Sequence, residues 1–375
     1  MPKLKFGDIV QNITQKATPK PGDERFYIGL EHLDSGSLKV SRWGSKVAIT
    51  GDKLLMRKGD ILFGRRNTYL RRVAIAPHDG LFSAHGMIFR AKENVINKDF
   101  LPFFIASDAF MDEAIRISVG SLSPTVNWKE LKELEFDIPT LEDQKRLTEL
   151  LVAINELKEK YLDLIAISDE LVKSQFIEMT QGVDTTSLSD ICCSYGRGKT
   201  PKYVTSSNVR VINQACIYWD HFKLQNVKYH NPDFFKEENK LILGDVLLNS
   251  TGTGTIGRAI VFDIEDENDY MTDSHVTILR PNNKKIHPVV LKYYFYDDNV
   301  QSELYRLCVF GSTSQAELSR EALGRMRVPV VDYRKQEAFV EVVKQTDKSK
   351  FEAKKAIEEL NSLQKKILLN VFGEQ

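Results

Sequence analysis

Two long stretches without proline or glycine place the strongest constraint on how this chain can fold. They cover residues 141–179 and 333–372, and in both of them apolar side chains recur every three or four residues. That spacing places the side chains along one face of an α-helix. The first series is Leu150, Ile154, Leu157, Tyr161, Leu164 and Leu171, with Ser168 as the one polar residue of the seam. The second is Phe339, Val343, Ala353, Ile357, Leu360, Ile367 and Val371.

Helices of this length need a packing partner. At a rise of 1.5 Å per residue, roughly forty residues form a rod of about 60 Å, several times the usual helix length. The two stretches carry net charges of −4 and +3. We therefore expect them to pair with each other as an intramolecular, antiparallel coiled coil. Two separate surface helices are the alternative.

Five short segments of the first half return in the same order in the second half. The matching pairs are 4–9 with 188–191, 58–62 with 243–247, 82–85 with 272–275, 120–123 with 311–314, and 138–139 with 328–329. Each match alone is weak, but their offsets all lie between 182 and 191 residues. Because both order and spacing are kept, we interpret the chain as a tandem duplication.

The predicted fold class is α+β, with two similar α/β domains, each followed by a long helix. We expect the first domain at 1–140, the first spacer helix at 141–181, the second domain at 182–330 and the second spacer helix at 331–375. Apolar stretches typical of strands lie at 60–63, 73–76, 87–89, 245–248, 259–262 and 276–279. The segments near 99–117 and 288–308 are predicted to be helices.

The composition is that of a soluble globular protein, with 42% hydrophobic and 28% charged residues. No apolar run has the length of a membrane span or the position of a signal peptide, so we expect a cytoplasmic protein. The four cysteines are Cys192, Cys193, Cys216 and Cys308. They lack the C-x-x-C spacing of a zinc site, and we expect reduced, mostly buried thiols.

Three motifs suggest an enzyme, and we favour a structural explanation for each. Residues 252–257 satisfy G-x-G-x-x-G, but a strand rather than a helix follows them, so a hairpin is favoured over a dinucleotide site. Residues 231–234, Asn-Pro-Asp-Phe, resemble a methyltransferase motif with the wrong third residue and indicate a turn. Asp233 and Glu238 imitate a nuclease signature but are too close in sequence. We therefore predict no catalytic residue, no metal site and no cofactor.

The net charge is zero and the isoelectric point is about 7.1, so any nucleic-acid contact must be local. Ten lysines and arginines, but only two acidic residues, fall between Lys39 and Arg72. The densest part, 64–72, lies between two predicted strands, where a loop could present arginine to guanine and asparagine to adenine. A solvated basic face is the alternative. The candidate DNA-binding residues of this half are Lys39, Arg42, Lys46, Arg65, Arg66, Asn67, Tyr69, Arg71 and Arg72.

The second half has a basic region of its own. Between residues 197 and 228 six lysines and arginines accompany a single acidic residue, and a Gly-Arg-Gly-Lys-Thr turn is expected at 196–200. A basic region in both copies is what a reader of two DNA half-sites needs. The candidate DNA-binding residues of this half are Arg197, Lys199, Lys202, Asn249, Thr251, Thr253, Arg258, Ser312 and Thr313.

A family resemblance rests on a motif that occurs twice. Residues 120–124, Gly-Ser-Leu-Ser-Pro, and 311–315, Gly-Ser-Thr-Ser-Gln, are each followed by an apolar residue with proline, a glutamine and a long helix. In this double arrangement the chain resembles the specificity subunits of Type I restriction-modification systems over essentially its whole length. The second copy is closer to the family pattern. The first copy departs from it at Leu122 and Pro124.

The resemblance implies a DNA-recognition subunit rather than an enzyme. Each domain would read one half of a split, asymmetric target through the major groove, and the helix pair would set the gap between the halves. Two methyltransferase (modification) subunits would dock on the helices and nearby domain surfaces, and a motor-nuclease (restriction) subunit would join them. S-adenosylmethionine, Mg²⁺ and ATP would belong to these partners. The dissimilar segments 10–57 and 192–240 would read different half-sites.

Other functions remain open at this point. The chain could be a methyltransferase or a nuclease built around Asn231 and Asp233, or a coiled-coil scaffold without a DNA role. It could also be the specificity subunit of a fused methyltransferase-nuclease that cuts on both sides of its target.

Overall fold

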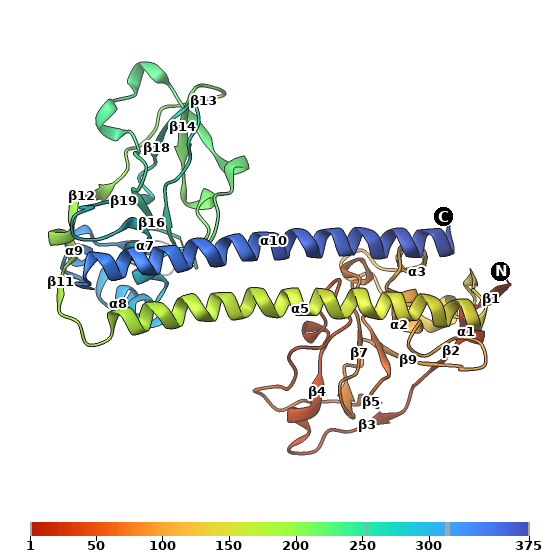
Figure 1. Cartoon of the computed structure of the whole chain (residues 1–375). Helices are drawn as coiled ribbons and strands as arrows, with labels where there is room; N and C mark the ends of the chain where they lie inside the picture. The colour runs from red at the N-terminus through yellow and green to blue at the C-terminus, as the bar shows by residue number, and fades with distance from the viewer. Residues whose placement is uncertain (1, 253, 312–315, 374–375) are drawn as a thin grey trace. The chain divides into compact units, whose positions relative to one another are not determined.

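The computed structural model describes residues 2–252, 254–311 and 316–373. It divides into two compact units (Figure 1). Unit 1 comprises Met1–Asp163 and Ala353–Gln375, and unit 2 comprises Leu164–Glu352. Each unit holds one α/β domain and one part of each long helix, α5 (Leu141–Thr180) and α10 (Tyr333–Phe372). The predicted α+β class, with two similar domains each followed by a long helix, is confirmed.

The α/β domain of unit 1 contains two four-stranded sheets. Its strands are β1 (Lys3–Lys5), β2 (Val10–Asn12), β3 (Lys16–Ala17), β4 (Tyr27–Ile28), β5 (Lys53–Met56), β6 (Ile61–Phe63), β7 (Val73–Ile75), β8 (Gly80–Phe82), β9 (Met87–Ala91) and β10 (Glu135–Asp137). The first sheet is antiparallel with the order β2-β9-β6-β7. The second has the order β3-β5-β8-β4, in which β4 and β8 are parallel. Strand β1 pairs separately with β10.

The α/β domain of unit 2 repeats most of this plan. Its strands are β11 (Thr185–Ser187), β12 (Cys192–Arg197), β13 (Tyr203–Val204), β14 (Val209–Ile212), β15 (Lys228–His230), β16 (Val246–Asn249), β17 (Ala259–Val261), β18 (Asp269–Thr272), β19 (Val276–Pro281), β20 (Val309–Phe310), β21 (Glu317–Leu318) and β22 (Arg327–Pro329). The order β12-β19-β16-β17 repeats the first sheet, and β11 pairs with β22 as β1 does with β10. The other four-stranded sheet has the order β13-β15-β14-β18.

The shorter helices also correspond between the units. Unit 1 has α1 (Phe6–Ile9), α2 (Leu101–Ala106), α3 (Asp108–Arg116) and α4 (Trp128–Leu131), and unit 2 has α6 (Leu188–Ile191), α7 (Pro288–Tyr296), α8 (Asp298–Cys308) and α9 (Arg320–Arg325). The predicted strands at 60–63 and 245–248 and the helices near 99–117 and 288–308 are confirmed. Residues 250–258 join the antiparallel strands β16 and β17, so the hairpin prediction is confirmed as well.

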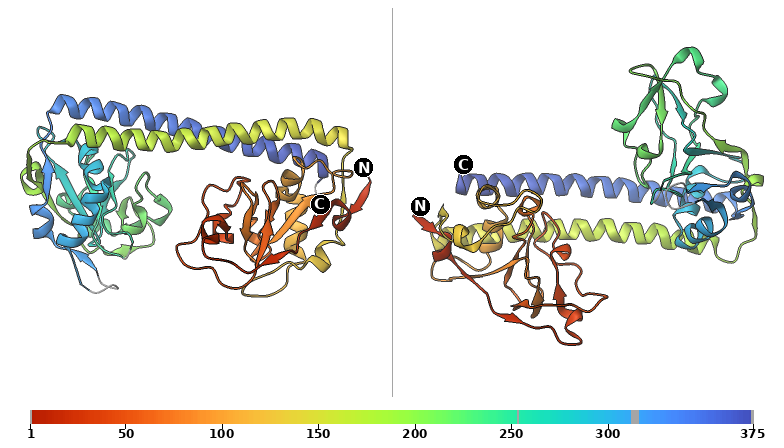
Figure 2. Two further views of the ribbon diagram at one scale, coloured as in Figure 1. Left: turned by 90° about the horizontal axis from the view of Figure 1, so that it is seen from below. Right: turned by 180° about the vertical axis from the view of Figure 1, so that it is seen from behind.

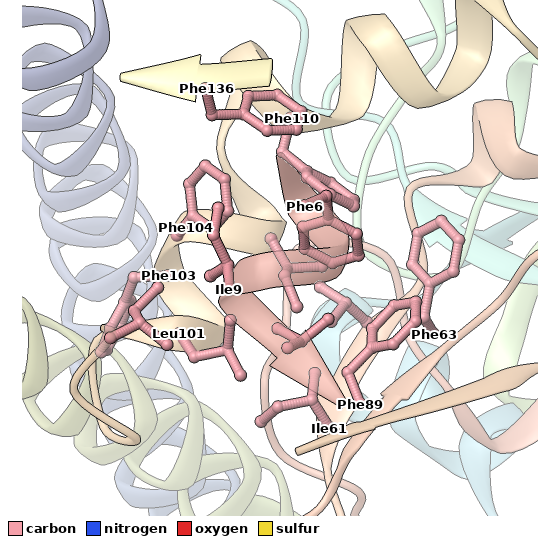
Figure 3. Packing of buried hydrophobic residues seen from close by; sticks show 14 of the residues in the cluster. Phe6, Ile9, Ile61, Phe63, Phe89, Leu101, Phe103, Phe104, Phe110 and Phe136 are labelled. Carbon is pink, nitrogen blue, oxygen red and sulfur yellow. The ribbon is translucent and has the colours of Figure 1, made fainter. Parts of the chain in front are cut away.

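Aromatic side chains fill the main core of unit 1 (Figure 3). The rings of Phe6 and Phe110 have centroids 4.8 Å apart, and Phe110 stacks on Phe136 at 5.5 Å. From α10, Phe372 packs on Phe104 at 5.2 Å. Buried aromatic rings contribute large apolar areas, so the end of α10 is held against the first domain by this core.

The main core of unit 2 holds the other ends of the long helices. Phe176 of α5 and Phe339 of α10 have ring centroids 5.7 Å apart, and Phe339 meets Tyr293 of α7 edge to face at 5.3 Å. Val172 and Val343 belong to the same cluster. The last part of α5 therefore packs with the first part of α10 in unit 2.

Within each unit α5 and α10 lie side by side and antiparallel, as expected of the predicted coiled coil (Figure 2). In unit 1, Lys158 hydrogen-bonds Gln364, and in unit 2, Asp169 pairs with Lys350. The second predicted seam holds, because all seven of its residues are buried or half-buried. In the first seam Ile154 and Ser168 are buried as predicted.

The prediction was wrong for four leucines of the first seam. Leu150, Leu157, Leu164 and Leu171 are 41–47% exposed, whereas Gln144, Thr148, Leu151, Lys158, Val172 and Phe176 are buried. The buried stripe contains several polar residues whose hydrogen bonds a count of apolar spacings does not register. Thr148, for example, donates to the carbonyl of Gln144. A leucine series every seven residues was therefore mistaken for the seam.

Two polar clusters recur in both units, with partners at equivalent positions. Gln144 accepts from the Asn97 N–H and donates to two carbonyls, while Gln336 accepts from the His287 N–H and also donates to two carbonyls. These glutamines tie the first turn of each long helix to the domain before it. Such shared detail supports the duplication, because buried polar groups need specific partners.

The second recurring cluster is an ion pair between a buried aspartate and a half-buried arginine. Arg90 binds Asp60 through two hydrogen bonds of 2.8 and 2.9 Å, and Arg280 binds Asp245 through two of 2.8 Å. Each aspartate follows a glycine with a positive φ, 88° at Gly59 and 89° at Gly244, which is a turn conformation that glycine adopts without strain.

The remaining sequence predictions concern cysteines and membranes. All four cysteines are free, with Cys216 and Cys308 buried, Cys192 half-buried and Cys193 exposed. Within the described residues no helix combines the length and apolar character that crossing a bilayer requires.

Candidate nucleic-acid interface

The arginine-rich loop of unit 1, residues 64–72, is held in one conformation. The Gly64 N–H donates to the Arg72 carbonyl at 2.9 Å and closes the loop between β6 and β7. Asn67 and Arg71 have positive φ values of 54° and 49°, which are uncommon for residues other than glycine. Thr68 is buried and donates to the Arg65 carbonyl at 2.9 Å. The backbone is therefore fixed before any ligand binds.

Two arginines of this loop hold it in place. Arg71 forms ion pairs with Asp108 and Asp112 of α3. Arg72 donates to the carbonyls of Leu30 and Arg66, and burial lowers the pKa of its guanidinium. Their side chains are already engaged with the protein, so we assign them to loop geometry first.

The other two arginines are available to a ligand. Arg65 is half-buried and Arg66 is exposed, and within the described residues neither has a carboxylate at ion-pair distance. Arg66 donates to the Ser123 hydroxyl at 3.3 Å. Beside them Tyr69 is 55% exposed. These side chains present positive charge and an aromatic ring on one loop.

The structure brings the loop together with the Gly-Ser-Leu-Ser-Pro segment. The Asn67 N–H donates to the Pro124 carbonyl at 2.7 Å, and Arg66 and Thr125 form a β-bridge. Leu122, at the tip of this segment, is 95% exposed. The family motif and the basic loop, whose contacting residues Arg66 and Ser123 are 57 residues apart in sequence, therefore form one surface.

The three earlier candidates of unit 1 lie on a separate segment. Lys39 pairs with Glu159 of α5 at 3.2 Å, and Arg42 pairs with Asp34 at 2.7 Å. Lys46 is exposed. No hydrogen bond or ion pair of the described chain joins these side chains to loop 64–72.

In unit 2 the loop after β16 has the same closure. The Asn249 N–H donates to the Arg258 carbonyl at 2.9 Å, as Gly64 does to Arg72. Arg258 also donates to the Gly254 carbonyl and lies over the Tyr218 ring at 5.2 Å. The Nε atoms of both Arg72 and Arg258 are buried, and neither has a hydrogen-bond partner among the described residues. These two arginines are therefore structural equivalents.

Two candidates of this loop point inward. Asn249 is fully buried and donates to the Gln214 carbonyl at 3.1 Å, and Thr251 donates to the Gln214 side chain at 2.9 Å. In this conformation they connect the loop to Gln214. Thr253, Ser312 and Thr313 lie outside the described residues.

The predicted turn at 196–200 was wrong in its first half. Gly196 and Arg197 belong to strand β12 and pair with Ile278 and Thr277 of β19. The strand continues because its register with β19 satisfies these backbone groups, which glycine content alone does not reveal. Arg197 pairs with Glu317 at 3.0 Å.

The exposed cations of unit 2 lie further along the chain. Lys199 and Lys202 are exposed, and Lys202 stands 3.2 Å from the centre of the Phe234 ring. Lys228 lies over the Tyr203 ring at 5.0 Å. Cations held against aromatic rings gain some electrostatic stabilisation and keep a defined position.

Unit 2 also has a polar groove of about 630 Å³ that was not predicted from the sequence. Among its lining residues are Tyr203, Gln214, Gln225, Asn226, Lys228 and His275. Thr251 Oγ1 lies 3.0 Å from His275 Nδ1, so the groove adjoins the loop after β16. Amides and imidazoles are groups that read base edges. Two adjacent amide pairs in the sequence, at 213–214 and 225–226, were the available signal.

Comparisons with known proteins agree with one another. The family model described as the Type I restriction modification DNA specificity domain matches residues 3–165 and 181–362. A curated relative, the Type I restriction enzyme EcoDI specificity subunit of Escherichia coli, is 22% identical over 185 residues. That alignment spans 48% of this chain and 41% of the relative.

Two solved structures share the fold. The S subunit of a Type I restriction-modification system from M. genitalium aligns over 100% of this chain and 96% of its own, with a TM-score of 0.58 and 15% identity. A chain from a study of complex assembly and conformational transition of the type I R-M system aligns over 100% and 98%, with a TM-score of 0.54 and 17% identity.

Proposed function

This chain belongs to the Type I restriction modification DNA specificity family, and on that premise we propose that it is the non-catalytic subunit that selects the DNA target of such a system. Each α/β domain reads one half of a bipartite, asymmetric DNA sequence. The subunit thereby directs a cytoplasmic complex that methylates or cuts DNA. S-adenosylmethionine, Mg²⁺ and ATP belong to the partner subunits, and this chain needs no cofactor of its own.

The equivalent loops after β6 and β16 carry the proposal. Both are closed by the same backbone hydrogen bond and end in an equivalent, half-buried arginine. A duplicated loop on a fixed frame gives one protein two recognition elements of similar placement and different chemistry. That is what an asymmetric two-part target requires, because each half must be read by its own side chains.

In unit 1 we assign DNA contact to Arg65, Arg66, Asn67 and Tyr69, with Ser123 beside them. Arginine donates two hydrogen bonds to the major-groove edge of guanine, and each good bidentate contact discriminates by roughly 1–3 kcal/mol. Arg71 and Arg72 hold the loop that presents these side chains. Preformed geometry favours binding because little conformational freedom is then lost.

In unit 2 the assignment shifts toward the polar groove and the cations beside it. Lys199, Lys202 and Lys228 supply phosphate contacts, while Gln225 and Asn226 supply base-edge contacts. Arg258 corresponds to Arg72 and holds its loop. The two halves thus present different groups, which is the reason to expect two different half-sites.

The exposed leucines of α5 provide a docking surface for partners. In unit 1 Leu150 and Leu157, and in unit 2 Leu164 and Leu171, form a series with a seven-residue spacing. These leucines are 41–47% exposed, and an exposed apolar heptad series is suited to pack against helices of another subunit. We assign it to the methyltransferase subunits, expected as two copies, with the restriction subunit joining the complex.

The decisive experiment reconstitutes the purified chain with its methyltransferase subunit and measures methyl transfer from labelled S-adenosylmethionine to DNA of the host's own methylated sequence. Arg66→Glu should lower transfer at least about tenfold, since a contact of 1.4 kcal/mol or more is lost and a like charge faces the phosphates. Lys98→Glu, at an exposed lysine away from the loop, should leave transfer near the starting rate.

Two results would overturn this function. Methyl transfer by the chain alone would identify an enzyme. If the Arg66→Glu complex methylated every target as fast as the unsubstituted complex, loop 64–72 would have no role in recognition. The double variant Leu150→Glu with Leu157→Glu tests docking. It should fold normally but no longer co-purify with the methyltransferase subunit.

A further inference from the structure

Unit 1 contains a cavity of about 240 Å³ between α5, α10, the segment 35–38 and the start of α3. A bulk water molecule takes about 30 Å³, so the cavity has room for several waters or for a small polyatomic ion. Its lining includes Arg71, Asp108, Asn155, Lys158, Asn361 and Lys365. Three of these six groups are cations and only one is a carboxylate.

Lys158 is the unusual member of this lining. Its side chain is 8% exposed, and its amine has a 3.4 Å hydrogen bond to the Gln364 side-chain oxygen. Among the described residues no carboxylate lies at ion-pair distance from it. The adjacent Glu159 is paired with Lys39 instead. A buried ammonium without a counter-charge is costly, and burial lowers the pKa of Lys158.

The duplication shows what a balanced version of this position looks like. Lys158 stands fourteen residues after Gln144, and Lys350 stands fourteen residues after the equivalent Gln336. Lys350 has two carboxylates at 2.9 Å, Asp347 on its own helix and Asp169 on α5. In unit 2 the equivalent lysine is therefore neutralised by two carboxylates.

In unit 1 both of those carboxylates are replaced by amides. The counterpart of Asp347 is Asn155, and the counterpart of Asp169 is Asn361, by the same count from the two glutamines. Both asparagines line the cavity. Amides can donate hydrogen bonds to an anion, which carboxylates cannot. The exchange thus removes two negative charges and introduces donors beside the buried amine.

The residue at one edge of the cavity also differs between the units. Ala106 stands two residues before Asp108 and lines the cavity, whereas Tyr296, two residues before Asp298, packs on Trp219 at 4.7 Å. A ring occupies in unit 2 the position that a methyl group has in unit 1.

The remaining charges around the cavity are accounted for. Asp108, its one carboxylate, is held by Arg71 and by Lys365 at 2.9 Å, and Arg71 is held by Asp112 as well. Asp108 is therefore neutralised by its own partners. Lys158 is left as the cation whose charge nothing in the lining balances.

We propose that this cavity binds a small phosphate-type oxyanion, with Lys158 as its principal cation and the amides of Asn155 and Asn361 as hydrogen-bond donors. The ligand is either free phosphate or the phosphate group of a nucleoside monophosphate. Bound there, the anion contacts both long helices and lies beside Arg71 of the recognition loop. This binding is separate from DNA recognition and does not rest on it.

The experiment is calorimetric titration of the purified full chain, in a phosphate-free buffer at constant ionic strength, with inorganic phosphate, adenosine monophosphate and chloride in turn. Saturable binding of phosphate or of the monophosphate, but not of chloride, is expected. Binding of phosphate alone identifies the free ion as ligand, and binding of both identifies the phosphate group as the recognised element.

Two variants locate the site. Lys158→Met keeps the aliphatic stem without the charge and should weaken binding about tenfold or more. Asn155→Asp with Asn361→Asp rebuilds the carboxylate pair of unit 2 around Lys158 and should abolish binding while the chain stays folded. Lys160→Met, at an exposed neighbour, is the matched control and should bind normally. The proposal would be overturned if the unchanged chain showed no saturable binding. It would also be overturned if Lys158→Met and the double aspartate variant bound phosphate as tightly as the unchanged chain.

Discussion

The two α/β domains differ most in their second sheets, although their first sheets are the same. In unit 1, strand β5 pairs with β8, while in unit 2 the corresponding β15 pairs with β14. Both sheets keep one parallel pair, β4 with β8 and β14 with β18. The first sheet and its buried polar clusters form a common frame, and the second sheet is the part in which the two domains diverge.

The ion pairs of the buried carboxylates Asp60 and Asp245 give the strongest test of that frame. Asp60→Ala and Asp245→Ala each remove the carboxylate that binds an arginine through two hydrogen bonds, and each should lower the free energy of unfolding by about 3 kcal/mol. Urea denaturation of the two variants measures this loss. A frame that is truly shared predicts equal losses in the two units.

The matched control for this prediction is an exposed ion pair. Glu321→Ala removes the partner of Arg325 on the surface of α9, and such pairs contribute at most about 0.5 kcal/mol. If either Asp60→Ala or Asp245→Ala lowered the free energy of unfolding by less than about 1 kcal/mol, the two clusters would be alike in geometry but would not stabilise their units equally.

The paired glutamines should show a smaller and again equal effect. Gln144→Leu and Gln336→Leu each leave one backbone N–H and two backbone carbonyls without a partner at the start of a long helix. Because an orphaned buried polar group costs about 1–3 kcal/mol and relaxation recovers part of it, we expect each variant to lose about 2 kcal/mol. Thermal unfolding followed by circular dichroism would measure both, and a loss confined to one helix would break the equivalence.

Much of the fold could be predicted from the sequence, because duplication and helix length are properties of order and spacing. The strands at 61–63 and 246–249 and the two long helices fall where the patterns place them. The buried seam of α5 was mispredicted because an exposed leucine series lies beside it on the same helix. Its buried stripe includes Gln144 and Lys158, whose partners come from other elements.

Less of the candidate interface could be predicted. The segment 64–72 was found because its charge density is high, but ion pairs to α3 decide which of its arginines face solvent, and those carboxylates are distant in sequence. Asn249 and Thr251 were chosen as polar loop residues, and their burial depends on Gln214. The groove of unit 2 combines strands and loops that only the rewired second sheet brings together.

The two equivalent lysines of the helix pair sharpen the comparison further. Lys350→Met leaves Asp169 and Asp347 facing each other without a cation, and because both carboxylates are about half exposed, we expect a loss of about 1 kcal/mol. Lys158→Met removes a buried charge that has no counter-charge, so its free energy of unfolding in phosphate-free buffer should stay equal or rise. Equal losses in the two variants would contradict the difference inferred from their surroundings.

The smallest effect concerns a position where the domains differ by one charge. Asp273 occupies the place of Ser83 at the end of the equivalent strand, and both side chains accept a hydrogen bond from the N–H two residues later. Burial raises the pKa of Asp273 above its ordinary value of 3.8, so its ionised form opposes folding at neutral pH and stability is regained as the pH falls through the raised pKa. Asp273→Ser should therefore raise the free energy of unfolding at pH 7 by less than about 1 kcal/mol, and the gain should vanish toward pH values below the ordinary pKa.

The reciprocal Ser83→Asp should destabilise unit 1 at pH 7 and less so in acid. Urea unfolding at several pH values separates this from a packing effect, because a gain that does not change with pH would show that the charge is not its cause.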